Sequence, residues 1–259
     1  MSKIITIAGQ KGGTGKSITA VNLAASLALF EKHTLLIDCD PQGCATQWCG
    51  IRNEDYNFDI TSVLSGRARV KDAIVKTQIK YLDMMPAEFA LFQAALKLAK
   101  NPGNEKILRL FLKDVKDEYD YIIIDSPSSY NFLSISAMTT ADWLLVCMSV
   151  HHNSVEDFHC LLRLVKYIRT TQKVPLKIAG VLFNRCGTKD EILSFLENQD
   201  LLDIKPMVYE TFIPEDDSIK SAIGSKHPVA LYDIKSPAAA AYLSFAKEMH
   251  FFFKSRGDL

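Results

Sequence analysis

The sequence predicts an α/β fold in which helices flank a doubly wound, mostly parallel β-sheet. Short apolar runs such as residues 4–8 and 121–124 alternate along the chain with longer segments whose apolar residues recur at helical spacing. The short runs are almost continuously apolar and rich in β-branched side chains, as in strands that are buried on both faces of a parallel sheet. Parallel neighbours need a crossover between them, and the helical segments supply it.

Length and composition bound the class of protein. The chain has 259 residues, 48% of them apolar, and no linker-like stretch, so residues 1–259 are expected to form a single domain. Lys plus Arg and Asp plus Glu each number 30, and this balance argues against a strong constitutive polyanion binder while leaving room for a local basic face.

Two further features concern location. No run approaches the roughly 18–20 apolar residues of a membrane span, and Met1-Ser2-Lys3 leads directly into a strand without a cleavage site. A cytoplasmic protein without a signal peptide is therefore expected.

The cysteines do not predict a metal site. None of them forms a C-x-x-C pair, and Cys39, Cys44 and Cys49 stand five apart, a poor spacing for zinc. Reduced thiols are expected, with an iron–sulfur protein as the weaker alternative.

The first elements are a strand at 4–8, a glycine-rich loop at 9–17 and a helix at 18–30. This order, with Gly-Lys-Ser at the end of the loop, is that of a phosphate-binding P-loop. Glycines let several backbone N–H groups point at one anion, at the positive end of the following helix. Lys16 is expected to bind the β- and γ-phosphates and the Ser17 hydroxyl to bind Mg²⁺.

Lys11 is an additional lysine near the start of this loop. From there it is poorly placed to reach phosphates that its own loop already surrounds. Across a two-fold interface, a lysine at this position reaches the phosphates of a second copy.

The next strand, residues 33–37, ends in Asp38 and Asp40, followed by Pro41 and a turn at Gly43. Acids at the carboxyl end of a parallel strand lie at the mouth of the site. One can orient or deprotonate an attacking water, and one can hold the water shell of a metal. Capping of the next helix is the alternative role for Asp38.

The middle of the chain carries fewer signals. Residues 44–80 are less regular, with short helical signals around 61–65 and 70–76. A strand at 81–85 stops at Pro86. Two helices, at 88–100 and 105–116, are expected to present lysines to solvent.

A second firm landmark is the strand at 119–125, an apolar β-branched run that ends in Asp125. An acid at the end of such a strand is the Walker B position, from which it reaches Mg²⁺ directly or through water.

Later elements complete the alternation: a helix at 132–139, a strand at 143–148, a helix from a Ser154 N-cap to about Thr170, strands at 177–185 and 208–213, and a helix at 237–253. Asn184 offers both a donor and an acceptor to an adenine edge, and a turn-forming role fits it equally. His151, His152 and His159 lack a third ligand at metal-site spacing and are interpreted as loop and cap residues.

Residues 11–17, Lys-Gly-Gly-Thr-Gly-Lys-Ser, resemble the deviant Walker A motif of the ParA/MinD family of P-loop ATPases, with Lys11 as the signature lysine. Asp40 before Pro41 is similar to the family's Walker A′ acid, and 119–127 is similar to its Walker B strand. The resemblance extends over essentially the whole chain. It implies a sandwich dimer formed with ATP and Mg²⁺, in which each Lys11 crosses to the nucleotide of the other subunit and Asp40 positions the hydrolytic water.

The site residues expected from the motifs and the resemblance form four groups. The catalytic residues are Lys11, Lys16 and Asp40. The nucleotide-binding residues are Lys11, Gly12, Gly13, Thr14, Gly15, Lys16, Ser17, Ile18, Asn184, Pro214, Glu215 and Asp217. The metal-binding residues are Ser17, Asp38 and Asp125, and the DNA-binding candidates are Arg185, Lys189, Lys220 and Lys226, each of which also fits a solvated surface charge.

The resemblance implies a function for this dimer: non-specific DNA binding and partitioning of a plasmid or chromosome, with a ParB-like partner that stimulates slow hydrolysis. Residues 40–43 are similar to ParA, whereas the loop at 214–219 is more similar to MinD. The alternative is therefore a MinD-like membrane-surface or cargo-positioning ATPase. Its membrane contact would be the apolar stripe of the last helix, Tyr242, Phe245, Met249, Phe252 and Phe253. Packing of this stripe on the sheet is the favoured interpretation, so a membrane partner is not expected.

Overall fold

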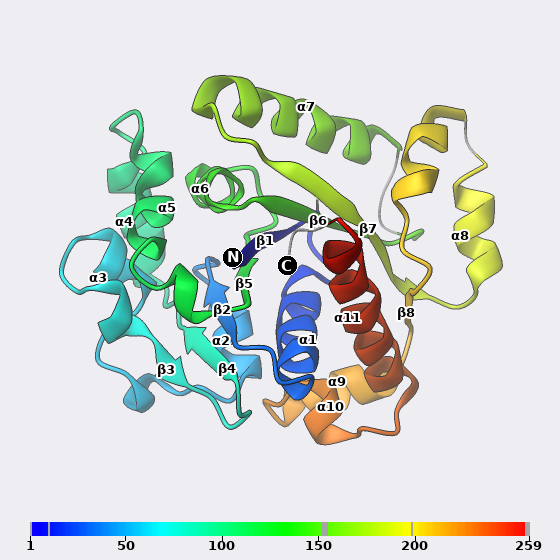
Figure 1. Ribbon diagram of the computed structural model, residues 1–259, viewed down its shortest axis with the longest axis horizontal. Coiled ribbons are helices and arrows are strands. Elements are labelled where there is room, and N and C mark those ends of the chain that lie inside the picture. The colour runs from blue at the N-terminus through cyan, green and yellow to red at the C-terminus, as the bar shows by residue number, and fades with distance from the viewer. Residues whose placement is uncertain (1, 10, 152–154, 198, 257–259) are drawn as a thin grey trace.

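The computed structural model describes residues 2–9, 11–151, 155–197 and 199–256, so His152 and the expected N-cap Ser154 lie outside the described residues. Within these ranges eight strands form one sheet in the order β3-β4-β2-β5-β1-β6-β7-β8 (Figure 1). The strands are β1 Lys3–Ala8, β2 Thr34–Asp38, β3 Val75–Lys76, β4 Leu82–Met85, β5 Tyr121–Asp125, β6 Trp143–Met148, β7 Lys177–Cys186 and β8 Ile213–Pro214.

All neighbouring strands pair in parallel except β3 and β4, so the expected doubly wound, mostly parallel sheet is confirmed. The central strands β1, β2, β5 and β6 are buried at every position, which explains why their sequences show no polar alternation.

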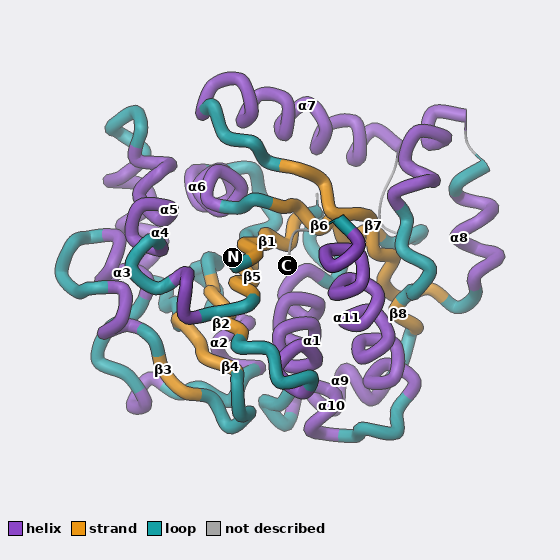
Figure 2. The backbone as a smooth tube through the Cα atoms, viewed as in Figure 1, coloured by secondary structure: helices purple, strands orange, loops and turns teal. Residues whose placement is uncertain are grey.

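Helices cover both faces of the sheet (Figures 1 and 2). The helices in the described residues are α1 Lys16–Leu29, α2 Cys44–Trp48, α3 Ile60–Leu64, α4 Ala90–Leu98, α5 Ile107–Leu112, α6 Phe132–Thr140, α7 Val155–Gln172, α8 Lys189–Phe195, α9 Asp217–Gly224, α10 Val229–Tyr232 and α11 Pro237–Ser255. Short 3-10 segments occupy Asn53–Asp55, Val70–Ala73, Asn104–Lys106, Lys116–Glu118 and Gln199–Met207.

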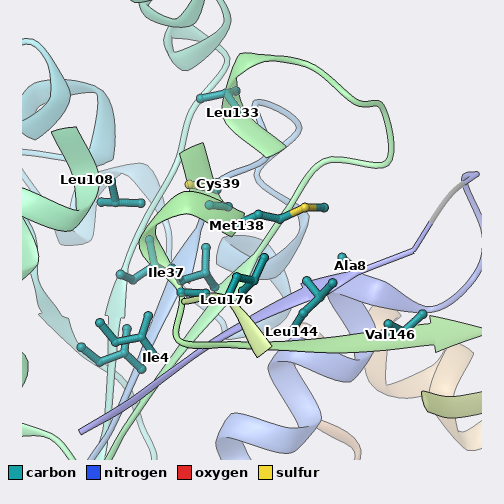
Figure 3. Close-up of a cluster of buried hydrophobic side chains, with 14 of the residues drawn as sticks. Ile4, Ala8, Ile37, Cys39, Leu108, Leu133, Met138, Leu144, Val146 and Leu176 are labelled. Atoms are coloured by element: carbon teal, nitrogen blue, oxygen red, sulfur yellow. The ribbon is translucent and has the colours of Figure 1, made fainter. Parts of the chain in front are cut away.

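The two faces bury separate hydrophobic clusters. Along β1, Ile4 and Ala8 belong to the cluster under α3 to α7, and Ile5 and Ile7 belong to the cluster under α1 and α11, because successive side chains of a strand point to opposite faces. Figure 3 shows part of the first cluster, where Ile4 meets side chains from neighbouring strands and helices.

Several elements differ from expectation. The helical signal at 70–76 is a 3-10 turn followed by β3, which pairs antiparallel with β4. The helix expected at 105–116 is reduced to a 3-10 turn and the short α5, Ile107–Leu112. Helices α8, α9 and α10 were not anticipated.

The strand expected at 208–213 is reduced to Ile213–Pro214 and one isolated bridge from Val208 to Val181. The carboxylate of Glu248 on α11 accepts hydrogen bonds from the backbone N–H groups of Glu210, at 2.7 Å, and Thr211, at 3.1 Å. A side chain from a distant helix thus satisfies donors that a strand would give to its neighbour.

The C-terminal helix packs as a core element beside α1 (Figure 1). Tyr242, Phe245, Met249 and Phe253 are fully buried, and Phe252 packs against the same cluster. The apolar stripe considered as a membrane contact therefore faces the protein interior, because the sheet and α1 need a cover. Among the described residues, no helix combines the length and apolar character needed to cross a membrane.

Candidate active site

Sheet order explains why residues far apart in the sequence share one site. Strand β5 lies between β2 and β1, and Asp38 at the end of β2 pairs in register with Asp125 at the end of β5. The loop after β1 leads into α1 at the same edge. A cavity of about 400 Å³ opens there, bordered by the P-loop, Asp40, Asn184 and residues 213–216.

Lys16 is buried at the base of this cavity. Its Nζ donates to the Lys11 carbonyl oxygen at 2.9 Å and lies 3.5 Å from Thr14 Oγ1. Lys11 has φ 73°, a left-handed conformation unusual for a residue with a side chain, and such strain is concentrated at functional sites. Burial lowers the pKa of Lys16, opposed by Cys147, Asp125 and Asp40. The hydrogen-bond partners of the ammonium are neutral, so its charge remains available to an anion.

Gly15 shows why the loop needs glycine. It has φ 84°, and a Cβ there would lie 3.0 Å from Cγ of Asn184. Asn184, only 1% exposed, donates from Nδ2 to the Thr14 carbonyl oxygen at 3.3 Å and to Thr19 Oγ1 at 3.2 Å. The structure thus uses this amide to brace the P-loop. A contact with adenine, the expected role, would require exchanging these bonds.

Asp38 is fully buried and its oxygens accept three hydrogen bonds. Oδ2 accepts from the N–H of Thr46 at 2.9 Å and from Thr46 Oγ1 at 2.8 Å, and Oδ1 accepts from the Asp40 N–H at 3.0 Å. Burial raises the pKa of Asp38 to about 6, and these hydrogen bonds oppose the rise. Because Thr46 lies in the first turn of α2, these contacts fit the helix-capping alternative; metal binding by Asp38 stays a prediction.

Asp125 is different, because neither of its buried oxygens has a hydrogen-bond partner among the described residues. Burial raises the pKa of this carboxyl well above its usual range; Asp38 adds to the rise, while the hydroxyl of Ser17 and the charge of Lys16 oppose it. An unpaired buried carboxylate is costly, and a cation removes the cost. Hard oxygen donors such as Asp125 and Ser17 suit Mg²⁺.

Metal-ligating side chains are sparse in the part of the chain that the structure describes. Within the described ranges, no three His, Cys, Asp or Glu side chains gather closely enough to hold an ion. Mg²⁺ bound at Asp125 and Ser17 would therefore complete its shell with phosphate oxygens and water, its usual mode. The Nε2 atom of His151 lies 3.8 Å from the Oε2 atom of Glu191 on α8.

Asp40 is half-buried and lines the cavity. Its Oδ1 accepts from the Gln42 N–H at 2.9 Å, which holds the loop in a tight turn. Gly43, with φ 63°, closes this turn; a Cβ there would lie 2.9 Å from the Ala87 carbonyl oxygen. The turn places a carboxylate at the opening of the cavity, beside the lysine at its base.

Lys11 points away from this cavity and is not among the residues that line it. Its Nζ forms a 2.8 Å ion pair with Asp157 on α7, and the lysine side chain is 53% exposed. The ammonium therefore stands on the rim, where a second molecule can reach it.

Of the residues predicted to bind nucleotide in the late loop, Pro214 and Glu215 line the cavity and Asp217 does not; their contact with a nucleotide stays a prediction. Asp217 is exposed and pairs with Lys220 at 2.8 Å. Asp216 borders the cavity in its place and caps α9 through a 2.8 Å hydrogen bond from the Ser218 N–H. The capping geometry turns Asp216 inward and leaves its neighbour in solvent.

The four DNA-binding candidates do not form one free basic face. Arg185 and Lys220 line the cavity, and Arg185 pairs with Glu215 at 3.5 Å. Arg185 lies at a register break between β7 and β8 and has φ 56°; such bulges re-aim side chains near sites. Lys189 begins α8 and Lys226 follows α9, and both are exposed.

Several cavity residues were missed by sequence reasoning, notably Trp48 on α2, Ile219 and Ile223 on α9, and Tyr242 on α11. The only signal in the sequence for Trp48 was its position shortly after the acidic turn. Helix α11 packs on α1 and α9 packs on α10, and no local pattern in the sequence specifies these contacts.

Comparisons with known proteins extend this picture. The family model described as "AAA domain" matches residues 2–178. The chain is 36% identical to the sporulation initiation inhibitor protein Soj of Bacillus subtilis, over 96% of this chain and 98% of that protein. It is 32% identical to the chromosome partitioning protein ParA of Myxococcus xanthus, over 96% of this chain and 88% of that protein.

A solved structure is also similar. The septum site-determining protein MinD of Pyrococcus horikoshii, complexed with Mg-ADP, superposes with a TM-score of 0.76 at 25% identity, covering 96% of each chain.

Proposed function

The chain belongs to the ParA/MinD family of P-loop ATPases, and on this premise we propose that it is a ParA-like ATPase of plasmid or chromosome partitioning. ATP and Mg²⁺ bind in the cavity at the P-loop, and two copies close over two nucleotides. The dimer binds DNA non-specifically, and a ParB-like partner stimulates hydrolysis. Residues 1–259 act as one domain, in the cytoplasm and on the nucleoid.

One observation carries the proposal: the two lysines of the loop are placed for different tasks. Lys16 lies buried beside Asp125, where it can serve a nucleotide in its own chain. Lys11 lies on the rim with its side chain 53% exposed. An ordinary P-loop needs only the first of these lysines, so the second is assigned to the nucleotide of a facing copy.

The chain's residues divide the work of hydrolysis. Backbone N–H groups of the loop and Lys16 hold the phosphates, with Lys16 giving up its bond to the Lys11 carbonyl. Asp125 and Ser17 hold the metal, which when bound supplies positive charge to the phosphate oxygens. Asp40 orients a water toward the γ-phosphorus and accepts its proton as the bond to ADP breaks. Lys11 of the facing copy adds positive charge to the transition state.

DNA binding is proposed for the dimer because affinity rises steeply with the number of phosphates contacted, so pairing two modest patches has a large effect. Lys189 and Lys226, both exposed, remain candidates for this contact. Arg185 and Lys220 are reassigned to the mouth of the nucleotide site, because both line the cavity and pair with acids.

A DNA mobility-shift assay at low salt tests the proposal by comparing the protein without nucleotide, with ADP and with ATP, each with Mg²⁺. A shift is expected with ATP, and Lys16→Ala is the control that should give none. Addition of a ParB-like protein should raise the ATPase rate. If no DNA is shifted under any nucleotide condition, the partition function is rejected although the ATPase assignment survives.

The similarity to MinD and the Pro214-Glu215-Asp216 loop favour one alternative, an ATPase that positions itself on a membrane surface or positions a cargo. Burial of the apolar side of α11 argues against the membrane form. Co-sedimentation with anionic liposomes that requires both ATP and the residues after Phe251 would favour it instead.

A further inference from the structure

The nucleotide cavity extends beyond the P-loop to an aromatic side chain on α2. Trp48 is half-buried and lines the same cavity as Lys16 and Asp40. Ile18 on α1 and Ile219 and Ile223 on α9 line it as well, so part of the cavity wall is apolar.

The position of Trp48 is set by packing. Helix α2 lies against α1 (Figure 1), and the residues that follow α2 lie against Lys226, which follows α9. A Cβ on Gly50, two residues after Trp48, would lie 3.2 Å from the Lys226 carbonyl oxygen. These contacts hold α2 in place, and the half-buried indole of Trp48 borders the cavity.

The polar group best placed to recognise a base is already engaged. Both polar atoms of the Asn184 side chain contact the P-loop or Thr19, and the residue is 1% exposed. Attraction for a flat aromatic base must then come from packing, and an indole offers the largest apolar aromatic face of any side chain.

We propose that Trp48 forms a wall of the base subsite, against which the purine of bound ATP packs. The inference rests on the proposed nucleotide binding and adds to it a residue that discriminates in favour of ligands with an aromatic base. Trp48 contacts the base, whereas the P-loop binds the phosphates. Removal of the indole should therefore lower the affinity for ATP without lowering the affinity for a ligand that lacks a base.

Intrinsic fluorescence provides the first test, because Trp48 and Trp143 are the two tryptophans of the chain. Trp143 is 4% exposed, packs against Phe252 and Phe253, and is not among the residues that line the cavity. In Trp143→Phe the emission reports Trp48 alone. Saturating ATP with Mg²⁺ should change that emission and protect it from acrylamide quenching. If Trp143→Phe proves unstable, the change in emission on adding ATP is compared between the wild type and Trp48→Phe. Only the wild type should then show the change.

The second test measures affinity by calorimetry for two ligands, ATP and inorganic tripolyphosphate, each with Mg²⁺. Trp48→Ala should lower the affinity for ATP about tenfold, which corresponds to the loss of one aromatic contact. The affinity for tripolyphosphate should not change. Trp48→Phe should retain most of the ATP affinity. Phe251→Ala, which removes an aromatic side chain that is 70% exposed on α11, is the matched control and should bind both ligands normally.

Two results would overturn the inference. Equal weakening of ATP and tripolyphosphate by Trp48→Ala would make Trp48 a structural support of the loop. Unchanged ATP affinity together with unchanged Trp48 emission would place the base elsewhere. A wild-type protein that binds no ATP at all would instead reject the proposed function, so the two failures are distinct.

Discussion

At the scale of single residues, burial decides the state of the charged groups at the site. Asp38 and Asp125 occupy equivalent positions at the ends of neighbouring strands, yet Asp38 accepts three hydrogen bonds and Asp125 none within the described chain. The first carboxylate is therefore stabilised by the protein itself. The Asp125 carboxylate is available to a cation. Without a cation it destabilises the folded protein, and this loss of unfolding free energy can be measured.

Asp125→Asn should stabilise the protein without nucleotide. Because the pKa of Asp125 is raised in the folded state, the stability that its proton confers is present at low pH and is lost as the pH rises through that pKa. The variant does not titrate, so its advantage in free energy of unfolding should grow as the pH rises from the ordinary carboxyl range, about pH 4, toward the raised pKa of Asp125. It should reach about 1–3 kcal/mol at the upper end. Denaturant unfolding measures this difference.

The same variant supplies its own control. Mg²⁺ and ATP should raise the stability of the wild type and should stabilise Asp125→Asn much less, because a ligand stabilises only the state that binds it. An advantage that does not change with pH would mean that the pKa of Asp125 is the same in the folded and the unfolded protein, so that its burial does not raise it.

The two loop lysines should separate in their effects. Lys16→Ala removes the buried charge that faces the cavity, so ATP affinity should fall at least about tenfold. Lys11→Ala removes a rim side chain, so ATP affinity should stay within about threefold while dimerisation and turnover are lost. Nucleotide titration measures the ATP affinity of both variants, and size-exclusion chromatography measures their dimerisation. Loss of ATP affinity in Lys11→Ala would place that lysine in its own cavity.

At the scale of elements, α11 is held by burial of aromatic side chains and also orders a distant segment. Its Glu248 carboxylate receives the backbone N–H groups of Glu210 and Thr211. Tyr242 reaches the nucleotide end of α1, where its hydroxyl lies 3.4 Å from Thr19 Oγ1. The helix therefore connects the wall of the cavity to the core under the sheet, which a membrane-facing helix would not do.

Phe253→Ala and Phe251→Ala form a matched pair on this helix. Phe253 is fully buried, with its ring centroid 5.3 Å from that of Trp143, so truncation should cost about 3–5 kcal/mol of unfolding free energy. Phe251 is 70% exposed, and its truncation should change stability by less than about 0.5 kcal/mol. Thermal and urea unfolding compare them. Similar small losses in both would show that α11 does not pack on the sheet in solution.

At the scale of the whole molecule, the sheet order places the P-loop and both carboxylates at one edge and leaves Lys11 at the rim of that edge. A face with a nucleotide at its centre and a cation at its border is suited to meeting a second copy of itself by two-fold symmetry. The γ-phosphate would then complete the interface, and its loss would open it.

The wild type should be a monomer without nucleotide and a dimer with a non-hydrolysable ATP analogue and Mg²⁺, by light scattering coupled to size exclusion. With ATP itself, Asp40→Ala should accumulate as a nucleotide-bound dimer, since the water is no longer oriented for attack. Normal ATP hydrolysis by Asp40→Ala would show that another group performs this step. A protein that stays monomeric with the analogue would contradict the sandwich arrangement.

Much of the fold followed from the sequence because local patterns carry it. Continuous apolar runs at 4–8 and 121–124 predicted buried parallel strands, and glycines followed by Gly-Lys-Ser predicted the phosphate loop. The ParA/MinD resemblance, carried by the same motifs, is confirmed by full-length relatives. These features depend on neighbours in the chain, so one sequence suffices to find them.

The tertiary structure decided what depends on partners distant in the chain. Asn184 proved to brace the P-loop, Asp216 rather than Asp217 borders the cavity, and residues 208–212 donate to a helix instead of extending a strand. Trp48 lines the cavity because α2 packs against α1, a contact between separate segments of the chain. These hydrogen bonds and buried contacts join segments that are distant in the sequence. A local sequence pattern therefore does not predict which side chains will be in contact.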